Sequence, residues 1–328
     1  MDTNKISRRG FMAAAGVGVA GLVPARLAAD SSASQSEDSP LPPRRFYTVL
    51  SLGRLGLRGS FDQSVALATK YGFEGVDPDA GLFARLSDDE LAKLLGDLKA
   101  KNVRLGAAGL PVEFREDEAT FSDGLKKLPD AAKALQRAGV RRVSTWVLPC
   151  SDALTYLQNF RQHASRLRAC ALVLRDHGQQ LGLEYCAPRT FWRSKRHSFI
   201  HSMSEMKELE VAIGTGNLGI QLDSFHWFNA EETGQDIETL RSGDIVTVDL
   251  NDAPPVPLDE QHDGTRELPA ATGVIPVASF LGALLRIGYD GPIQAEPFNK
   301  ALAALPVEEA CSKTADAIKK AFATAGTA

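Results

Sequence analysis

The sequence IGYDGPIQAEPF, residues 287–298, decides the fold of this chain. An apolar helical pattern before it ends at Gly288, and glycine is the common residue at the left-handed position that ends a helix. A short turn follows, and PIQA, residues 292–295, reads as a buried strand that stops at the carboxylate of Glu296. The same order of helix end, tight turn and strand recurs in YGFEGV (71–76), KNVRLG (101–106) and AGVRRVS (138–144).

Eight strand and helix units follow one another along the chain. The predicted strands are 47–52, 74–76, 103–107, 143–147, 180–185, 218–222, 245–250 and 292–295. The predicted helices are 60–71, 88–101, 118–138, 153–178, 202–213, 233–241, 276–287 and 307–324. Regular alternation indicates parallel strands joined by helical crossovers, so we expect an α/β fold, a single (β/α)8 TIM barrel over 45–328. An open doubly wound sheet is the alternative, but no GxGxxG follows the first strand, which gives a dinucleotide site no support.

The first 29 residues have the composition of an export signal. SRRGFM, residues 7–12, resembles the twin-arginine motif, a weakly apolar stretch covers 12–23, and Ala28 and Ala29 offer a cleavage region. Such a stretch is too short to span a bilayer. We therefore expect export by the twin-arginine machinery, to the periplasm or outside the cell. A disordered basic N-terminus is the alternative, and the Ser- and Pro-rich residues 30–44 read as a flexible linker.

The charge of the chain argues against a nucleic-acid partner. The whole sequence has 37 basic and 41 acidic residues, and residues 1–29 hold four of the former and one of the latter, which leaves 33 and 40 in the remainder. A net charge of −7 after trimming is opposite to that of a general nucleic-acid binder. None of the four cysteines forms a CxxC pair, so buried free thiols are expected.

Four successive strands carry an acid near their C-terminal end. These acids are Glu184, Asp223, Asp249 and Glu296. A single acid at this place can cap the next helix, but in a barrel all four would meet at one mouth. Anions so close repel one another. A divalent cation resolves the repulsion, and oxygen ligands favour Mg²⁺ or Mn²⁺.

The stretches LGLEYCAP, GIQLDSFHW, VDLNDAP and RELPAATGVIPVASFLGALLRIGYDGPIQAEPF resemble the xylose isomerase-like barrel superfamily, and within it the sugar phosphate isomerase/epimerase group. The resemblance covers about residues 45–325. It implies metal ligands Glu, Asp, His and Glu on strands five to eight, and so assigns Glu184, Asp223 and Glu296. Asp249 stands where the family usually has His, which makes the set all-carboxylate and favours one Mn²⁺ or Mg²⁺ over Zn²⁺.

The resemblance also implies a reaction. We expect a metal-dependent isomerase or epimerase of a keto-sugar or related polyol, with Glu184 and Glu296 transferring the proton through a metal-stabilised ene-diolate. His226 and Arg266 are expected to contact substrate oxygens, and His201, on the loop after the fifth strand, is a further candidate. A lyase or dehydratase on the same substrates and a non-catalytic sugar-binding protein remain alternatives. A nuclease of the same superfamily is not supported, because the sequence has no His at the ends of the second and third strands.

Two further expectations concern the rest of the chain. The partner is a small carbohydrate, and a homodimer is possible because barrels of this group often pair. His163 and His177 fall on a predicted outer helix and are expected to be solvated.

Overall fold

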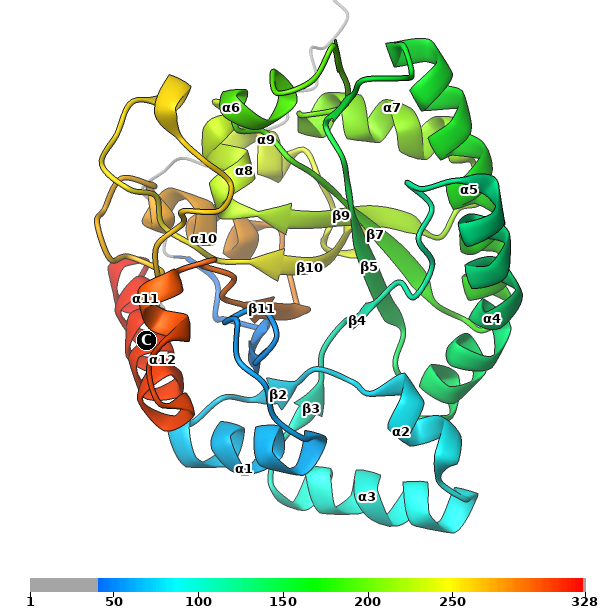
Figure 1. Ribbon diagram of the computed structural model, residues 1–328. Coiled ribbons are helices and arrows are strands. Elements are labelled where there is room, and N and C mark those ends of the chain that lie inside the picture. Colours follow the sequence, from blue (N-terminus) through cyan, green and yellow to red (C-terminus); the bar gives the residue numbers. More distant parts are fainter. Residues whose placement is uncertain (1–40, 327–328) are drawn as a thin grey trace, which may run out of the picture. The chain divides into compact units, whose positions relative to one another are not determined.

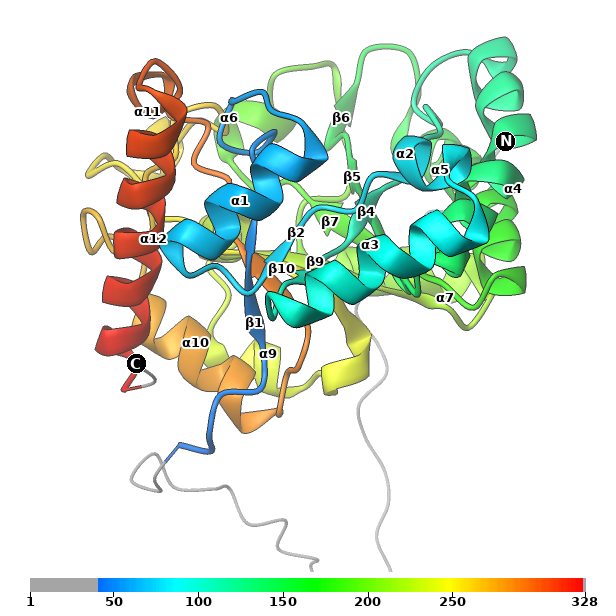
Figure 2. The ribbon, with the colours of Figure 1, turned by 90° about the horizontal axis from the view of Figure 1, so that it is seen from below.

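The computed structural model describes residues 41–326, which belong to one compact unit. Strands occupy the centre and helices surround them (Figure 1), and α1, α3 and α12 run along the outside of the barrel (Figure 2). The predicted single (β/α)8 barrel is confirmed. The predicted export segment, 1–29, and most of the predicted linker, 30–44, lie outside the described residues.

Nine parallel strands form the sheet, in the order β3-β2-β1-β11-β10-β9-β7-β5-β4. Their bounds are β1 Tyr47–Leu50, β2 Gly75–Val76, β3 Arg104–Leu105, β4 Ala108–Gly109, β5 Arg142–Val147, β7 Gln180–Tyr185, β9 Leu218–Asp223, β10 Ile245–Asp249 and β11 Pro292–Gln294. A separate antiparallel pair joins β6 (Cys150–Ser151) to β8 (His197–Ser198).

The third barrel strand is interrupted, and this explains a ninth strand in an eight-unit barrel. The sequence predicts one strand over 103–107, but β3 pairs only with β2 and β4 only with β5. Gly106 still donates its N–H to Val76 O at 2.9 Å. The two ends of the sheet are therefore consecutive pieces of one chain segment, and the covalent link between them closes the barrel.

Twelve α-helices connect the strands within residues 41–326. They are α1 Phe61–Tyr71, α2 Ala80–Arg85, α3 Asp88–Ala100, α4 Glu118–Arg137, α5 Tyr156–Asp176, α6 Arg189–Trp192, α7 Met203–Ile213, α8 Ser224–Asn229, α9 Gly234–Glu238, α10 Val277–Arg286, α11 Lys300–Ala303 and α12 Val307–Thr324. Their ends follow local chemistry: Ser60 caps α1 through Gln63 N, and Gly72 ends it at a φ of 81°. In this part of the chain no helix is long and apolar enough to cross a bilayer.

Close packing inside the barrel relies on glycine at two neighbouring strands. A Cβ on Gly182 would lie 2.8 Å from Val246 Cβ, and one on Gly219 would lie 2.7 Å from Asp244 O. The expectation that His163 is solvated is wrong. Its ring is 3% exposed and packs between Phe114 and Phe199, because this side of α5 faces the barrel.

Candidate metal centre

The four predicted carboxylates meet at the C-terminal end of the barrel. Glu184 is near the end of β7, Asp223 and Asp249 end β9 and β10 as register partners, and Glu296 follows β11. One oxygen from each lies within 4.8 Å of the others. Successive parallel strands ending at one rim produce this convergence. Asp223 also caps α8, since it accepts a hydrogen bond from Phe225 N at 2.7 Å. Asp223 is therefore both a helix cap and a member of the acid cluster.

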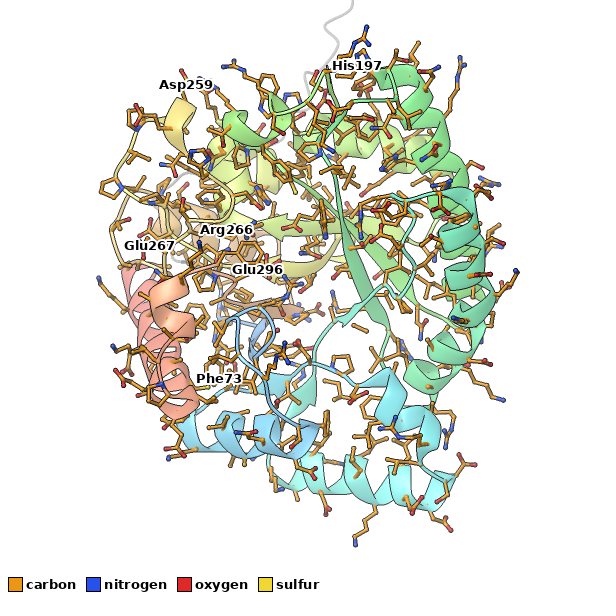
Figure 3. The ribbon with its side chains drawn as sticks, viewed as in Figure 1. Phe73, His197, Asp259, Arg266, Glu267 and Glu296 are labelled. Atoms are coloured by element: carbon orange, nitrogen blue, oxygen red, sulfur yellow. The ribbon has the colours of Figure 1, made fainter. Side chains whose placement is uncertain are left out.

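Two arginines enter the same cluster. Arg266 Nη1 lies 2.6 Å from Asp223 Oδ2 and 3.0 Å from Glu296 Oε2. Arg54, just after β1, places Nη1 3.0 Å from Asp249 Oδ2 and 2.7 Å from Glu296 Oε1. Figure 3 shows Arg266 and Glu296 side by side. The two guanidiniums leave at least two of the four negative charges uncompensated.

Burial and this excess of negative charge both shift the pKa values of the cluster. Burial, followed by repulsion from Glu296, raises the pKa of Glu184 well above its usual range. Burial raises the pKa of Asp223 to about 7 although Arg266 opposes the shift, and burial also raises the pKa of Glu296. Carboxylates that resist ionisation in the absence of a cation are expected where a cation belongs.

Amide side chains donate hydrogen bonds to two of the acids and so fix their orientation. Asn251 donates Nδ2 to both oxygens of Asp223, at 3.1 and 3.2 Å, and accepts from Glu296 N at 2.8 Å. Gln221 donates to Asp249 Oδ2 at 2.7 Å, and Gln294 to Asp249 Oδ1 at 2.9 Å. Partners of this kind orient the ligands of a metal site.

Asp252 has a structural role in the loop that carries Arg266. Its carboxylate accepts hydrogen bonds from four backbone N–H groups, those of Ala253, Thr272, Gly273 and Ile275, at 2.7 to 2.9 Å. Asp252 also forms an antiparallel bridge with Glu267. The TGVI turn is thereby tied to the end of β10, and Arg266 is held over the acids.

His226 lies beside the cluster and is fully buried. Burial, with Arg266 as a second cause, lowers its pKa to about 3, so the imidazole is neutral. Both ring nitrogens face N–H donors: Ala187 N is 3.3 Å from Nδ1, and Arg266 Nη2 is 3.0 Å from Nε2. A neutral ring has one acceptor nitrogen, so one of these contacts is not a hydrogen bond.

The residues present fit a divalent cation. Glu184 Oε1 is buried and has no hydrogen-bond partner among the described residues, and a buried carboxylate oxygen without a partner is costly. Oxygen donors from four carboxylates suit a hard ion. Cys186 and His226 also lie close to Glu184 as a second group of metal-ligating atoms, but the four acids share the larger uncompensated charge.

A small pocket of about 230 Å³ opens onto the cluster. Its lining residues are Trp146, Glu184, Cys186, Phe191, Asp263, Arg266, Glu296 and Phe298. His201 is not among them: its ring stacks on Trp192 with 4.6 Å between centroids, and Nδ1 lies 2.7 Å from Phe199 O. His197 lies in β8 at the outer edge of the molecule (Figure 3).

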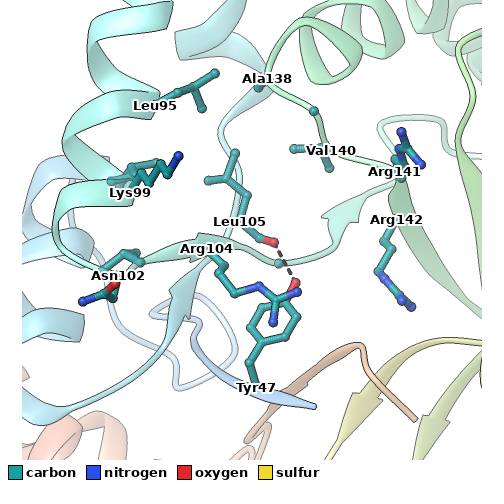
Figure 4. A pocket seen from close by; sticks show the side chains of 14 residues that line it. Tyr47, Leu95, Lys99, Asn102, Arg104, Leu105, Ala138, Val140, Arg141 and Arg142 are labelled. Carbon is teal, nitrogen blue, oxygen red and sulfur yellow. Dashed lines mark hydrogen bonds between the residues drawn. The ribbon is translucent and has the colours of Figure 1, made fainter. Parts of the chain in front are cut away.

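A larger groove of about 620 Å³ lies at the other end of the barrel (Figure 4). Residues at strand N-termini line it, among them Tyr47, Arg104 and Arg142. Arg104 packs over Tyr47 at 3.6 Å, and Arg142 donates to the carbonyls of Ile245 and Val246. Barrel chemistry sits at the opposite end, so this groove is structural.

Sequence reasoning missed Arg54, Asp263 and the aromatic rim of Trp146 and Phe298. Asp263 Oδ1 lies 2.7 Å from Arg266 Nη2 and 3.5 Å from His226 Nε2. The three-residue spacing between Asp263 and Arg266 was the one signal in the sequence. Arg54 had none, since its partners are distant in the sequence.

The sequence profile described as xylose isomerase-like TIM barrel matches residues 65–321. The chain belongs to this family, which confirms the predicted resemblance to the xylose isomerase-like barrels. A solved xylose isomerase domain protein from Alicyclobacillus acidocaldarius is 30% identical, with a TM-score of 0.75 over 86% of this chain and 99% of that one. A solved IolI protein with a bound zinc atom is 18% identical, with a TM-score of 0.69 over 86% and 98%.

The curated relatives are enzymes. An inosose isomerase of Bacillus velezensis is 23% identical over 75% of this chain and 86% of its own length. A 3-dehydroshikimate dehydratase of Pseudomonas putida is 24% identical over 79% of this chain but only 39% of its own length. The chain thus spans about two fifths of the length of the curated dehydratases it matches. These relatives confirm the prediction that the chain is an enzyme.

Proposed function

We propose that this chain is a divalent-metal-dependent isomerase or epimerase of a keto-sugar or a related polyol. The observation that carries the proposal is the meeting of four carboxylates within 4.8 Å at the active end of the barrel. Similarity to a protein named inosose isomerase, which matches most of its own length, supports the same reaction class.

The ion would be held by Glu184, Asp223, Asp249 and Glu296, and their oxygen donors favour Mn²⁺ or Mg²⁺. When bound, a divalent ion supplies Lewis-acid polarisation of substrate oxygens. Glu184 and Glu296 move the substrate proton in this proposal. Glu184 is the better placed to accept it, because Oε1 has no hydrogen-bond partner among the described residues and lies 3.6 Å from His226 Nε2, whereas both oxygens of Glu296 face guanidiniums.

His226 and Arg266 are proposed to hold substrate oxygens. A neutral His226 faces donors at both ring nitrogens, and a substrate oxygen near Nε2 would relieve that conflict by accepting the Nε2 proton. Arg266 lines the pocket with its guanidinium already placed by Asp223 and Asp263. Trp146, Phe191 and Phe298 line the same pocket and would exclude water from the reacting carbon. His201 stays a weaker candidate for substrate contact.

A dehydratase is the second candidate, and the similarity to 3-dehydroshikimate dehydratases favours it. The first step, removal of a proton next to a carbonyl, is common to both reactions. In a dehydratase the neighbouring hydroxyl then leaves as water, while in an isomerase or epimerase the proton returns to carbon.

The deciding experiment incubates the purified protein with Mn²⁺ and a panel of keto-sugars, inososes and cyclic hydroxyketones in D₂O. The proposal expects deuterium at the carbon next to the carbonyl, with a new stereoisomer or carbonyl position of unchanged mass apart from the label. A product lighter by one water would establish the dehydratase. No exchange in any substrate class, with metal bound, would contradict both.

We also propose export through the twin-arginine pathway to the periplasm or cell exterior, from the motif in residues 7–12. A reporter fused after residue 44 should be exported, and an Arg8→Lys/Arg9→Lys variant of the same fusion should stay inside. A homodimer is the proposed assembly, and sedimentation of the purified barrel would detect a monomer if this is wrong.

A further inference from the structure

Arg54 forms two ion pairs, and both are with members of the acid cluster. It lies in the tight turn after β1, where Leu55 N donates to Ser51 O at 3.3 Å, and its side chain reaches the ends of the next two strands of the sheet, β11 and β10. The two carboxylates it contacts, Asp249 and Glu296, belong to different strands. Both are members of the four-acid cluster.

Arg54 occupies carboxylate oxygens that a metal ion would need as ligands. Its Nη1 lies 3.0 Å from Asp249 Oδ2 and 2.7 Å from Glu296 Oε1, so an ion held by these two residues must share them with a guanidinium. Like charges repel one another, and the repulsion grows with the charge of the ion and with burial. Arg54 therefore repels the ion while it attracts the ligands.

Arg266 is less free than Arg54 to leave the acid cluster. Arg266 is 2% exposed and also pairs with Asp263, so its departure would leave that acid without its guanidinium partner. The Arg54 side chain is 21% exposed. Both acids in its ion pairs are ones that the ion would take, and its charge also acts on the nearby Asp77. Of the two cations, Arg54 is the one that can withdraw when an ion binds.

We infer that Arg54 is a built-in counter-ion that holds Asp249 and Glu296 together when the site lacks an ion, and that it lowers the affinity of the site by competing with the ion for them. This inference rests on the proposed metal site but concerns affinity and stability, not the reaction. Arg54 is thus a positioning residue and not a catalytic one.

The test measures binding of Mn²⁺ alone by calorimetry, and thermal unfolding in EDTA, for the native chain, Arg54→Met and Arg54→Lys. Loss of the charge should tighten Mn²⁺ binding at least about tenfold, while Arg54→Lys, which keeps the charge, should stay within about threefold of the native chain. In EDTA, Arg54→Met should unfold at a lower temperature, because one counter-ion is lost from a buried acid cluster. Equal or weaker Mn²⁺ binding by Arg54→Met overturns the inference.

The outcomes separate this inference from the proposed function. If both proteins bind Mn²⁺ equally, the inference fails and the metal site stands. If only Arg54→Met binds Mn²⁺, the inference holds and metal dependence of the native chain fails; if neither binds, both fail. Should Arg54→Met not fold, Asp249→Asn and Arg54→Met/Asp249→Asn replace it, since the double variant loses one charge of each sign. The double variant must then bind Mn²⁺ more tightly than Asp249→Asn, or the inference is overturned.

Discussion

Ser224 and Asn251 join the ends of β9 and β10 through two hydrogen bonds. Asn251 N donates to Ser224 Oγ at 2.8 Å, and Ser224 Oγ donates to Asn251 O at 3.0 Å. The Asn251 side chain then reaches Asp223 on one side and the backbone of Glu296 on the other. One buried amide therefore fastens three ligand-bearing segments, and the protein itself sets the spacing of the acids.

Replacement of Asn251 by Asp should be more damaging than replacement by Ala. Asp has nearly the same shape but substitutes an acceptor for the N–H donor to Asp223, and it adds another buried acid to an anionic cluster. We expect Asn251→Asp to lose about 3 kcal/mol or more of unfolding free energy, by analogy with other uncompensated buried charges. Urea unfolding in EDTA at pH 8 measures it. Equal losses in the two variants would mean that charge is not the limiting factor.

Glutamine at Glu184 should abolish turnover while the fold is retained. A substituted general base costs about 10²- to 10⁴-fold in rate, and Gln keeps the size of the side chain. We expect Glu184→Gln to lose solvent deuterium exchange and Glu296→Gln to lose isomerisation, each with kcat lowered by at least about 10². Matched thermal unfolding curves serve as the control. Full activity of Glu184→Gln with bound metal would remove it from the proton-transfer role.

Removal of divalent ions should destabilise the folded chain. A ligand that binds only the native state at 100 times its Kd stabilises it by about 2.7 kcal/mol. We expect Mn²⁺ to raise the Tm above its value in EDTA, and Asp223→Asn to reduce this rise. A matched variant outside the cluster, Asp290→Asn, should keep the full rise. A rise of equal size in both variants would place the ion elsewhere.

Loss of Asp252 should loosen the loop that carries Arg266. Its carboxylate accepts four backbone hydrogen bonds, and bonds to charged acceptors contribute about 1.5 to 3 kcal/mol each. We expect Asp252→Ala to speed hydrogen exchange at Thr272, Gly273 and Ile275 well before global unfolding. Unchanged exchange at these amides would show that other contacts hold the turn.

The contribution of His163 to stability should decrease on mild acidification. Burial, the first cause, lowers the pKa of this histidine from 6.5 to about 4. The unfolded chain therefore binds a proton below pH 6.5 that the folded chain refuses until about pH 4, so unfolding becomes easier as the pH falls through this window. The expected loss is about 3 kcal/mol in total. Buried carboxyls with raised pKa values, such as Asp223, act in the opposite direction over the same pH range. Urea unfolding of the native chain and of His163→Gln at pH 7.5 and 4.5 therefore isolates the contribution of His163: on acidification the native chain should lose about 3 kcal/mol relative to the variant.

The periodic parts of the fold could be predicted from the sequence. Helices such as α1 and α7 span several turns with caps at both ends, and the strand ends carry recognisable acids. The four-residue helices α6 and α11 were missed, as was α8, because so short a segment shows no helical period. The predicted helix at 233–241 is shorter in the structure, where α9 ends at Glu238.

The arginines that pair with the acids could not be predicted in the same way. Arg54 meets Asp249 and Glu296 across 195 and 242 residues of sequence, and no local pattern records such a contact. The acids were found because each belongs to its own strand end, whereas Arg54 follows from barrel closure alone. His163 was misplaced for a related reason, since an amphipathic helix does not show which neighbours cover a polar position.

The interruption between β3 and β4 has a consequence for how the barrel moves. Every other neighbouring pair is joined by a hydrogen-bonded ladder, but across this junction the ring depends on the peptide linkage through Gly106 and Ala107. We expect such a junction to deform more easily than the paired parts of the wall. Opening and closing of the barrel wall should concentrate there, on the side opposite the acid-bearing strands, so that the wall can flex while the geometry of the four carboxylates stays constant.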